Sequence, residues 1–203
     1  MMAGMCPSLR EQHKVRTSAS IASAALELFA ARGYAAVTVG EVAAAAGVGE
    51  RTLSRYFADK DDLLFGEDEQ LRATLRSAID QQPSGQPPFT VLRAASASVA
   101  RVLQDRREEV ARRARIIASS SALNARDRVK RGAWEAVLAE GLSQRGVSSA
   151  EASLLGRIGV ACHDEALSRW LEQDRPRRPL DVELDATFTE LAALAATGGW
   201  SRP

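Results

Sequence analysis

The chain has 203 residues, of which 45% are hydrophobic and 26% charged, and its formal net charge is only +1. Length and composition are those of a globular protein with a sizeable core, and the balanced charge argues against a protein that coats nucleic acid with its whole surface. Two distant cysteines and two isolated histidines give neither a disulfide framework nor metal-ligand spacing, so we expect no cofactor and no metal. Because neither a signal peptide nor a bilayer-spanning run is evident, we expect a cytoplasmic protein without membrane contact.

Helical periodicity begins near the N-terminus and dominates the chain. In the first predicted helix, residues 17–32, the apolar residues Ile21, Leu28 and Phe29 fall on one face. Gly33 follows at the position where a residue in the left-handed conformation commonly ends a helix. Strand-like alternation is absent, so the predicted fold class is all-α.

A capped helix and a tight turn come next. Thr38 and Glu41 form a T-x-x-E capping box, which satisfies backbone N–H groups at the start of a helix predicted for residues 39–46. Gly47-Val48-Gly49 then makes a turn before a second short helix at about 50–57. Two short helices joined by a tight glycine-containing turn are typical of a helix-turn-helix unit.

The second of these helices has two different faces. Leu53 and Phe57 share an apolar face, whereas Arg51 and Arg55 project outward and Thr52 lies near the border. Eight helical residues make a rod of roughly 12 Å, which suits a DNA major groove about 12 Å wide. Arginine can bridge both acceptors of guanine, and threonine can contact a thymine methyl group.

Phosphate contacts are expected from the flanks of this unit. The hydroxyl of Thr38 lies at a helix start, and Tyr56 and Lys60 offer a phenol and an ammonium group. An N-terminal arm of basic side chains is expected along the DNA backbone, and its members are Arg10, Lys14 and Arg16. The residues predicted to contact double-stranded DNA are Thr38, Arg51, Thr52, Arg55, Tyr56 and Lys60.

The same pattern leaves other functions open. Paired short helices also occur in helical adaptors that contact proteins, and an adaptor would lack DNA affinity and a steep salt dependence. A DNA-binding activator, or a binder without a ligand, would bind DNA and ignore metabolites. We expect no enzyme, because His163, Asp164 and Glu165 are neighbours on a helix, point in different directions and form no convergent catalytic site.

The rest of the chain reads as further helices. Asp59 is a suitable cap for a helix expected to run to about Gln81, and QQPSGQPP at 81–88 is predicted to be a loop. Later helices are expected at 89–104, 107–119, 121–145, 149–173 and 181–197, with a break at 174–179 and disordered ends at 1–9 and 198–203.

The segment ALELFAARGYAAVTVGEVAAAAGVGERTLSRYFADKDDLL (25–64) resembles the DNA-binding domain of the TetR family of bacterial transcriptional regulators. The resemblance implies a homodimer that binds a palindromic operator, with a C-terminal all-helical domain that dimerises and binds a small-molecule inducer. The expected domains are 10–64 for DNA binding and 65–200 for ligand binding and dimerisation. The landmarks are Phe29, Gly33-Tyr34, Thr38, Ala46-Gly47-Val48, Thr52-Leu53, Tyr56-Phe57, Lys60 and Leu63.

Three positions depart from the family pattern. Gly49 replaces the usual serine cap, and Ser54 stands where an aromatic residue is frequent. Glu50 is acidic on the expected reading face, where it would repel phosphate or accept a hydrogen bond from cytosine. These departures bear on the operator sequence rather than on the fold.

Two segments of the second half are similar to the ligand domain of TetR regulators that bind acyl-CoA-like ligands. They are REEVARRARIIASSSALNARDRVKRGAWEAVLAEGL (107–142) and ASLLGRIGVACHDEALSRWLEQ (152–173). Their apolar stripes are core positions first, but a cavity between bundle helices is a usual place for a ligand, and Arg112, Arg113 and Arg115 are available for a CoA head group. The predicted pocket residues are Ile116, Ile117, Ser120, Trp134, Leu138, Ile158 and Cys162.

The helices expected at 149–173 and 181–197 carry more apolar surface than one core needs, which predicts a dimer interface. We therefore expect a repressor that a small hydrophobic or acyl-CoA-like ligand releases from its operator. The ligand is expected to act through the helix that begins near Lys60, by binding one of two conformations more tightly than the other.

Overall fold

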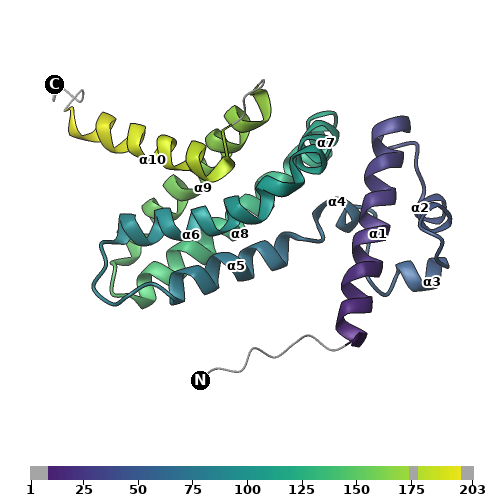
Figure 1. Cartoon of the computed structure of the whole chain (residues 1–203), viewed down its shortest axis with the longest axis horizontal. Helices are drawn as coiled ribbons and strands as arrows, with labels where there is room; N and C mark the ends of the chain where they lie inside the picture. Colours follow the sequence, from purple (N-terminus) through teal and green to yellow (C-terminus); the bar gives the residue numbers. More distant parts are fainter. Residues whose placement is uncertain (1–8, 174–177, 198–203) are drawn as a thin grey trace. The chain divides into compact units, whose positions relative to one another are not determined.

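The computed structural model describes residues 9–173 and 178–197. Within these ranges every regular element is a helix and no strand is present, which confirms the predicted all-α fold class (Figure 1). The disorder predicted for the two ends, apart from Leu9, which is helical, and most of the break predicted at 174–179 lie outside the described residues. None of the described helices is both long and apolar enough to cross a membrane.

The chain divides into two compact units that do not follow one another simply along the sequence. The N-terminal unit runs to Gly66 and also includes Arg112–Leu123. The C-terminal unit comprises Glu67–Ala111 and the chain from Asn124 onward. Each unit has its own apolar core. The sequence does not indicate that a later segment returns to the N-terminal unit, because an amphipathic helix does not show which core it joins.

The N-terminal unit is built around its first helix, which packs against the second and the fourth. Ile21 and Phe29 of this helix are buried together with Leu53 from the third. Ile116 and Leu123, from the segment that returns to the unit, complete the core. The first four helices are α1 (Leu9–Arg32), α2 (Val39–Ala45), α3 (Glu50–Leu53) and α4 (Asp62–Phe65).

The C-terminal unit has α6 at its centre, where it contacts α5, α9 and α10. Leu92, Ala95 and Val99 of α6 are fully buried, and Phe89 meets Phe188 of α10 edge-on at 5.4 Å between ring centroids. The remaining elements are α5 (Asp68–Asp80), α6 (Pro88–Leu103), the 3-10 turn η1 (Gln104–Arg106), α7 (Arg107–Ala118), α8 (Ser121–Gln144), α9 (Ser149–Glu172) and α10 (Leu180–Ala196).

The first helix begins earlier than its predicted start at residue 17. Inside this helix the Thr17 hydroxyl donates to the carbonyl of His13 one turn earlier, at 2.9 Å. A threonine within a helix can satisfy its hydroxyl in this way. The described helix therefore starts at Leu9.

The second helix of the paired unit is shorter than the predicted 50–57. The α-helix α3 ends at Leu53, and tighter bonds follow, from Arg55 N–H to the carbonyl of Thr52 at 3.2 Å and from Tyr56 N–H to that of Leu53 at 2.9 Å. Ser54 also donates its hydroxyl to the carbonyl of Glu50 at 3.0 Å. Such side-chain bonds compete with the regular helical pattern.

The helix predicted from Asp59 to Gln81 is wrong as a single element, because α4 ends at Phe65 and α5 begins at Asp68. Asp59 does accept the N–H of Asp62 at 2.8 Å, but the residue at the cap position of α4 is Asp61 rather than the predicted Asp59. Gly66 occupies the break, and a Cβ there would lie 2.7 Å from the Asp62 carbonyl oxygen and 2.9 Å from the ring of Phe57. Crowding by a residue nine positions away is not visible in a helical pattern.

Candidate nucleic-acid interface and cavities

Reciprocal hydrogen bonds hold the start of α2. Glu41 N–H donates to Thr38 Oγ1 at 3.2 Å, and Thr38 N–H donates to Glu41 Oε2 at 2.7 Å, which confirms the capping box. Arg32 pairs with the other carboxylate oxygen at 2.7 Å. The backbone bond from Thr38, followed by the bond from Arg32, lowers the pKa of Glu41 to about 2. The Thr38 hydroxyl, which the sequence places at a phosphate, also donates to Glu41 Oε2 at 2.9 Å.

The turn between α2 and α3 closes on backbone bonds. Gly47 N–H donates to the carbonyl of Ala44 at 3.1 Å, and Val48 N–H donates to that of Ala43 at 3.0 Å. This pair of bonds is a Schellman motif, which requires a left-handed residue, and Gly47 has a φ of +68°. Gly49 then caps α3 without a side-chain bond. These bonds fix the direction in which the chain turns from α2 into α3, as expected for the predicted glycine turn.

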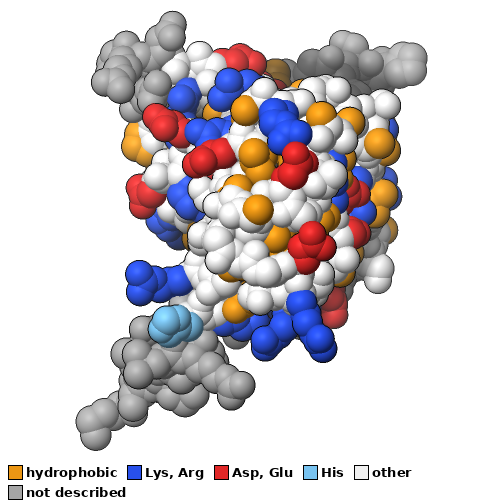
Figure 2. All heavy atoms as spheres, turned by 90° about the vertical axis from the view of Figure 1, so that its right-hand side faces the viewer, with side chains coloured by type: hydrophobic (Ala, Val, Ile, Leu, Met, Phe, Trp, Pro, Cys, Tyr) orange, Lys and Arg blue, Asp and Glu red, His pale blue; other side chains and the backbone are white. Residues whose placement is uncertain are grey.

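Two arginines, Arg51 on the outward face of α3 and Arg55 in the turn that directly follows α3, have side chains without intramolecular partners. Leu53 is buried, whereas Arg51 and Arg55 are exposed, and within the described chain neither arginine side chain has a hydrogen bond or an ion pair. Thr52 and Tyr56 are half-buried between the two faces. The view of Figure 2 shows basic, acidic and hydrophobic side chains intermixed, with several Lys and Arg side chains projecting from the surface. These two arginines are therefore free to bind an external acceptor.

Glu50 does not extend straight from the reading face. A Cβ added to Gly40 of α2 would lie 2.5 Å from Glu50 Oε1, so this carboxylate rests against the first turn of α2. That position separates its charge from the tips of the exposed α3 side chains. The sequence alone suggests an acidic group facing DNA, because periodicity gives the face of a residue but not the direction of a flexible side chain.

Lys60 is held within the N-terminal unit by aromatic rings and a carbonyl. Its Nζ lies 4.2 Å from the centroid of the Tyr34 ring and 5.6 Å from that of Phe29, and it donates to the Tyr34 carbonyl oxygen. Partial burial lowers the pKa of Lys60. The Tyr34 hydroxyl in turn donates to Asp61. These contacts give Lys60 a structural role, because they join the segment after α1 to the segment before α4. The phosphate contact that the sequence predicts for Lys60 would be an additional role.

The structure places the seven predicted pocket residues in two groups. Ile116 and Ile117 pack with the core of the N-terminal unit, and Ser120 accepts a bond from Leu123 N–H at 3.4 Å near the start of α8. The other four belong to the C-terminal unit, where Leu138 and Cys162 are buried. These four are Trp134, Leu138, Ile158 and Cys162.

The four residues in the C-terminal unit line two different hollows. Ile158 and Cys162 face an apolar groove of about 250 Å³ between α9 and α10. Trp134 and Leu138 line a small, partly open cavity of about 10 Å³, which is room for about one water molecule. The complete lining of this cavity is Leu75, Ser96, Trp134, Leu138, Gly159, Val160 and His163.

Polar contacts on both sides fix the wall formed by Trp134. Its indole N–H donates to Asp68 Oδ1 at 2.7 Å, and its ring lies 5.6 Å from the ring of His163. Burial, followed by the positive charge of Arg131, lowers the pKa of His163 to about 4, so its imidazole is neutral at pH 7. In the sequence His163 is an isolated histidine, because Trp134 and Arg131, which lie near it, belong to another helix.

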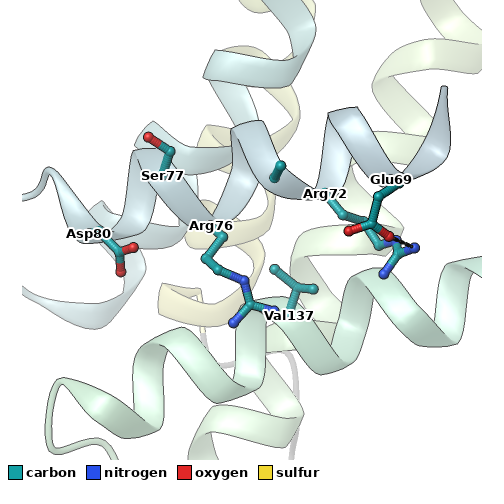
Figure 3. A pocket seen from close by; sticks show the side chains of 7 residues that line it. Glu69, Arg72, Arg76, Ser77, Asp80 and Val137 are labelled. Atoms are coloured by element: carbon teal, nitrogen blue, oxygen red, sulfur yellow. Dashed lines mark hydrogen bonds and ion pairs between the residues drawn. The ribbon is translucent and has the colours of Figure 1, made fainter.

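Figure 3 shows a second groove, of about 250 Å³, between α5 and α8. Arg72 lies beside Glu69, with 2.5 Å between the paired atoms, and also pairs with Asp68 at 2.9 Å. Arg76 pairs with Glu140 at 3.1 Å. Because carboxylates already balance both arginines, this groove is not a site for an anion.

The geometry of the N-terminal unit defines a class of protein. A capped helix, a Schellman turn and a short helix, with two unpartnered arginines on it and directly after it, form a helix-turn-helix that can bind DNA. Comparison with known proteins then identifies the family. The sequence model described as "Bacterial regulatory proteins, tetR family" matches residues 21–66, and the model of the MftR C-terminal domain matches residues 86–196. The chain belongs to the TetR family of transcriptional regulators, which are not enzymes.

Two curated relatives are regulators. A protein of Mycobacterium tuberculosis named as a mycofactocin biosynthesis transcriptional regulator, MftR, is 31% identical over 125 residues, which cover 62% of this chain and 63% of the relative. The HTH-type transcriptional regulator TcmR of Streptomyces glaucescens is 32% identical over 93 residues, which cover 46% of this chain and 41% of the relative. The chain thus spans less than two thirds of the length of either relative.

Solved structures have a similar fold. The regulator FadR of Bacillus subtilis, solved in complex with stearoyl-CoA, has a TM-score of 0.59 and 19% identity, with coverage of 85% of this chain and 96% of that one. The TetR-family repressor FadR of Thermus thermophilus, solved with lauroyl-CoA, has a TM-score of 0.52 and 26% identity, with coverage of 86% and 93%.

Proposed function

We propose that the chain is a cytoplasmic, homodimeric repressor that binds a palindromic DNA operator through residues 10–64. The observation that carries this proposal is the exposed pair Arg51 and Arg55, which have no partner within the described chain and lie on a rigidly capped helix-turn-helix. Thr52 and Tyr56 lie next to this pair in the sequence. Thr38 caps α2 and Lys60 contacts Tyr34, and we expect both to lie near the path of the DNA backbone.

The second part of the proposal is that residues 65–200 bind an acyl-CoA-like ligand and form the dimer. Two features support the ligand class: two acyl-CoA-bound FadR proteins have a similar fold, and the C-terminal unit has an apolar groove of about 250 Å³ between α9 and α10. The similarity to the Thermus protein is the stronger support, because its sequence identity is 26%.

Exposed leucines on α9 and α10 support the dimer. Leu154 is 58% exposed and Leu194 is 67% exposed, and Leu194 borders the apolar groove between these two helices. A contiguous apolar surface, such as this groove with Leu194 at its edge, is typical of surfaces that another chain covers. A second copy that pairs its own α9 and α10 here would bury them in a symmetric interface.

The mechanism follows from linkage between the two sites. A dimer that holds its two α3 helices about 34–36 Å apart fits successive major grooves of the operator. A ligand lowers operator affinity when it binds more tightly to the conformation that does not fit the operator than to the one that does. The loss of operator-binding free energy cannot exceed the difference between the ligand's binding free energies for these two conformations.

The test is a DNA-shift titration of the purified protein on its own upstream intergenic region, with excess competitor DNA, with and without palmitoyl-CoA. We expect a specific shift that palmitoyl-CoA releases. A specific shift that palmitoyl-CoA does not change would support the DNA-binding function and contradict the proposed ligand class. If that fragment gives no shift, a selection from random oligonucleotides decides, and recovery of no preferred sequence would overturn the DNA-binding function in favour of a protein adaptor.

A further inference from the structure

Gly40, in α2, is a glycine that its backbone conformation does not require. Its φ is not positive, and the helix around it contains three alanines. Inside a helix glycine is less favourable than alanine, because it has more conformational freedom to lose. The surroundings of Gly40 supply a reason for a glycine at this position.

The carboxylate of Glu50, the first residue of α3, occupies the space beside Gly40. A Cβ at position 40 would lie 2.5 Å from Glu50 Oε1 and 3.4 Å from Glu50 Cδ. Apart from α2 itself, no other described residue has an atom within 4 Å of that Cβ position. A separation of 2.5 Å is too short for a carbon and an oxygen that are not bonded. The carboxylate can therefore hold this position only because residue 40 has no side chain.

No cation holds the Glu50 carboxylate, in contrast to the carboxylate of Glu41 in the first turn of α2. Glu41 pairs with Arg32 at 2.7 Å and accepts the backbone N–H of Thr38 at 2.7 Å. Within the described chain the Glu50 carboxylate has neither a hydrogen bond nor an ion pair. Its position is therefore set by the free space at Gly40 rather than by a charged partner. A change in that space is enough to move it.

We propose that Gly40 is a positioning residue for DNA binding, which keeps the negative charge of Glu50 against α2 and away from the side of α3 that carries Arg51. This inference rests on the proposed DNA-binding function and names a residue that acts on DNA only through Glu50. If residue 40 had a Cβ, the carboxylate would turn toward solvent, because the buried Leu53 fills the core side of α3. There it would repel phosphate or pair with Arg51, and either interaction weakens DNA binding.

The test is a double-mutant cycle on the full chain, with Gly40→Ala, Glu50→Gln and the double variant. Fluorescence anisotropy measures the affinity for a selected operator duplex at low and at high salt. Gly40→Ala should lower operator affinity about 5-fold at low salt, as expected for one like-charge contact at about 4 Å in water. The difference from the wild type should shrink at high salt, because salt screens exposed charges. In the Glu50→Gln background the same alanine should have no effect, because no charge is left to displace.

Thermal unfolding separates positioning of the charge from damage to α2. Alanine is the better helix former, so Gly40→Ala should not lower the unfolding temperature although it lowers operator affinity. Gly132→Ala on α8 is the matched control, because a Cβ there meets no atom within 4 Å, and it should leave operator affinity unchanged. Glu50→Gln alone is a second test that leaves α2 intact, and it decides if Gly40→Ala does not fold. Because the carboxylate already lies away from the DNA-facing side, this variant should change operator affinity by much less than about 5-fold.

Three results would contradict the inference. An equal loss of affinity from Gly40→Ala in both backgrounds would assign Gly40 to the geometry of α2 instead. Wild-type affinity in Gly40→Ala would mean that the position of the carboxylate does not affect DNA binding. A rise in affinity of about 5-fold or more from Glu50→Gln alone would mean that the carboxylate already faces the DNA. If the wild-type chain selects no preferred sequence from random oligonucleotides, the DNA-binding function itself is wrong, and the inference falls with it.

Discussion

At the scale of single residues, Arg51 is the side chain most directly available for reading bases. It is exposed and has no partner within the described chain. Arg51→Ala should lower affinity for the selected operator about tenfold or more, because one bidentate arginine–guanine contact gives about 1–3 kcal/mol of discrimination. Affinity for scrambled DNA should change much less.

Competition binding on operator and scrambled duplexes measures both affinities. Arg101→Ala is the matched control, since Arg101 is also exposed but lies on α6. An equal loss on operator and scrambled DNA would assign Arg51 to the phosphates rather than to the bases.

Lys60 is expected to act on stability first and on DNA second. Its ammonium lies 4.2 Å from the centroid of the Tyr34 ring and donates to the Tyr34 carbonyl. Lys60→Ala should therefore lower the unfolding free energy by about 1–2 kcal/mol. Lys60→Met, which keeps the aliphatic stem without the charge, separates packing from electrostatics. Chemical denaturation measures the stability, and the dependence of operator affinity on salt measures any phosphate contact. If Lys60→Ala left stability unchanged but made operator affinity less dependent on salt, Lys60 would act only as a phosphate contact.

His163 makes stability depend on pH in a defined window. Its pKa is about 4 in the folded chain, against an ordinary value of 6.5. The unfolded state therefore takes up a proton first as pH falls, and the contribution of neutral His163 is fully present above about 6.5 and lost toward pH 4. His163→Phe should flatten the fall in unfolding free energy across this window, as measured by urea denaturation at several pH values. His13→Phe, at an exposed position on α1, should leave the curve unchanged.

At the scale of elements, the sequence predicts helix caps and turns well, because residues a few positions apart determine them. The capping box of Thr38 and Glu41 and the turn at Gly47 depend on residues a few positions apart, and both are present. The break at Gly66 depends on the ring of Phe57, and periodicity does not reveal it. The packing of Ile116 in the N-terminal core also depends on contacts distant in the sequence, and a helical stripe does not reveal it.

Close approach of α8 and α9 gives a prediction at this scale. A Cβ at Gly156 would lie 2.6 Å from the carbonyl oxygen of Glu135, a backbone atom that cannot easily move. Gly156→Ala should lower the unfolding free energy by about 1–3 kcal/mol. Gly132→Ala is the control, because a Cβ there meets no atom within 4 Å. That exposed helical substitution should instead raise stability by up to about 1 kcal/mol. Equal effects in thermal unfolding would mean that α8 and α9 are not in tight contact.

At the scale of the whole molecule, the low net charge of +1 is compatible with DNA binding because the contact is local. Arg51 and Arg55 concentrate unpaired positive charge on α3 and the turn that follows it, while most described arginines of the C-terminal unit are paired with carboxylates, as Arg72, Arg131 and Arg169 are. A few released counterions still give a marked dependence of affinity on salt. Affinity then requires two such helices on one assembly, so the proposed regulator depends on its dimer.

The dimer can be tested by placing a charge on its proposed interface. Leu194 on α10 is 67% exposed beside the apolar groove, and Leu194→Glu would place a carboxylate where the partner copy is expected to pack. We expect a folded monomer by sedimentation velocity at micromolar concentration, with strongly reduced affinity for a full operator but a similar, weak affinity for a single half-site. Val129→Glu is the control, because Val129 is 76% exposed on α8, away from that groove. If Leu194→Glu remained dimeric and Val129→Glu became monomeric, the interface would lie on α8, and a ligand bound beside α8 would then act directly on the dimer rather than through α9 and α10.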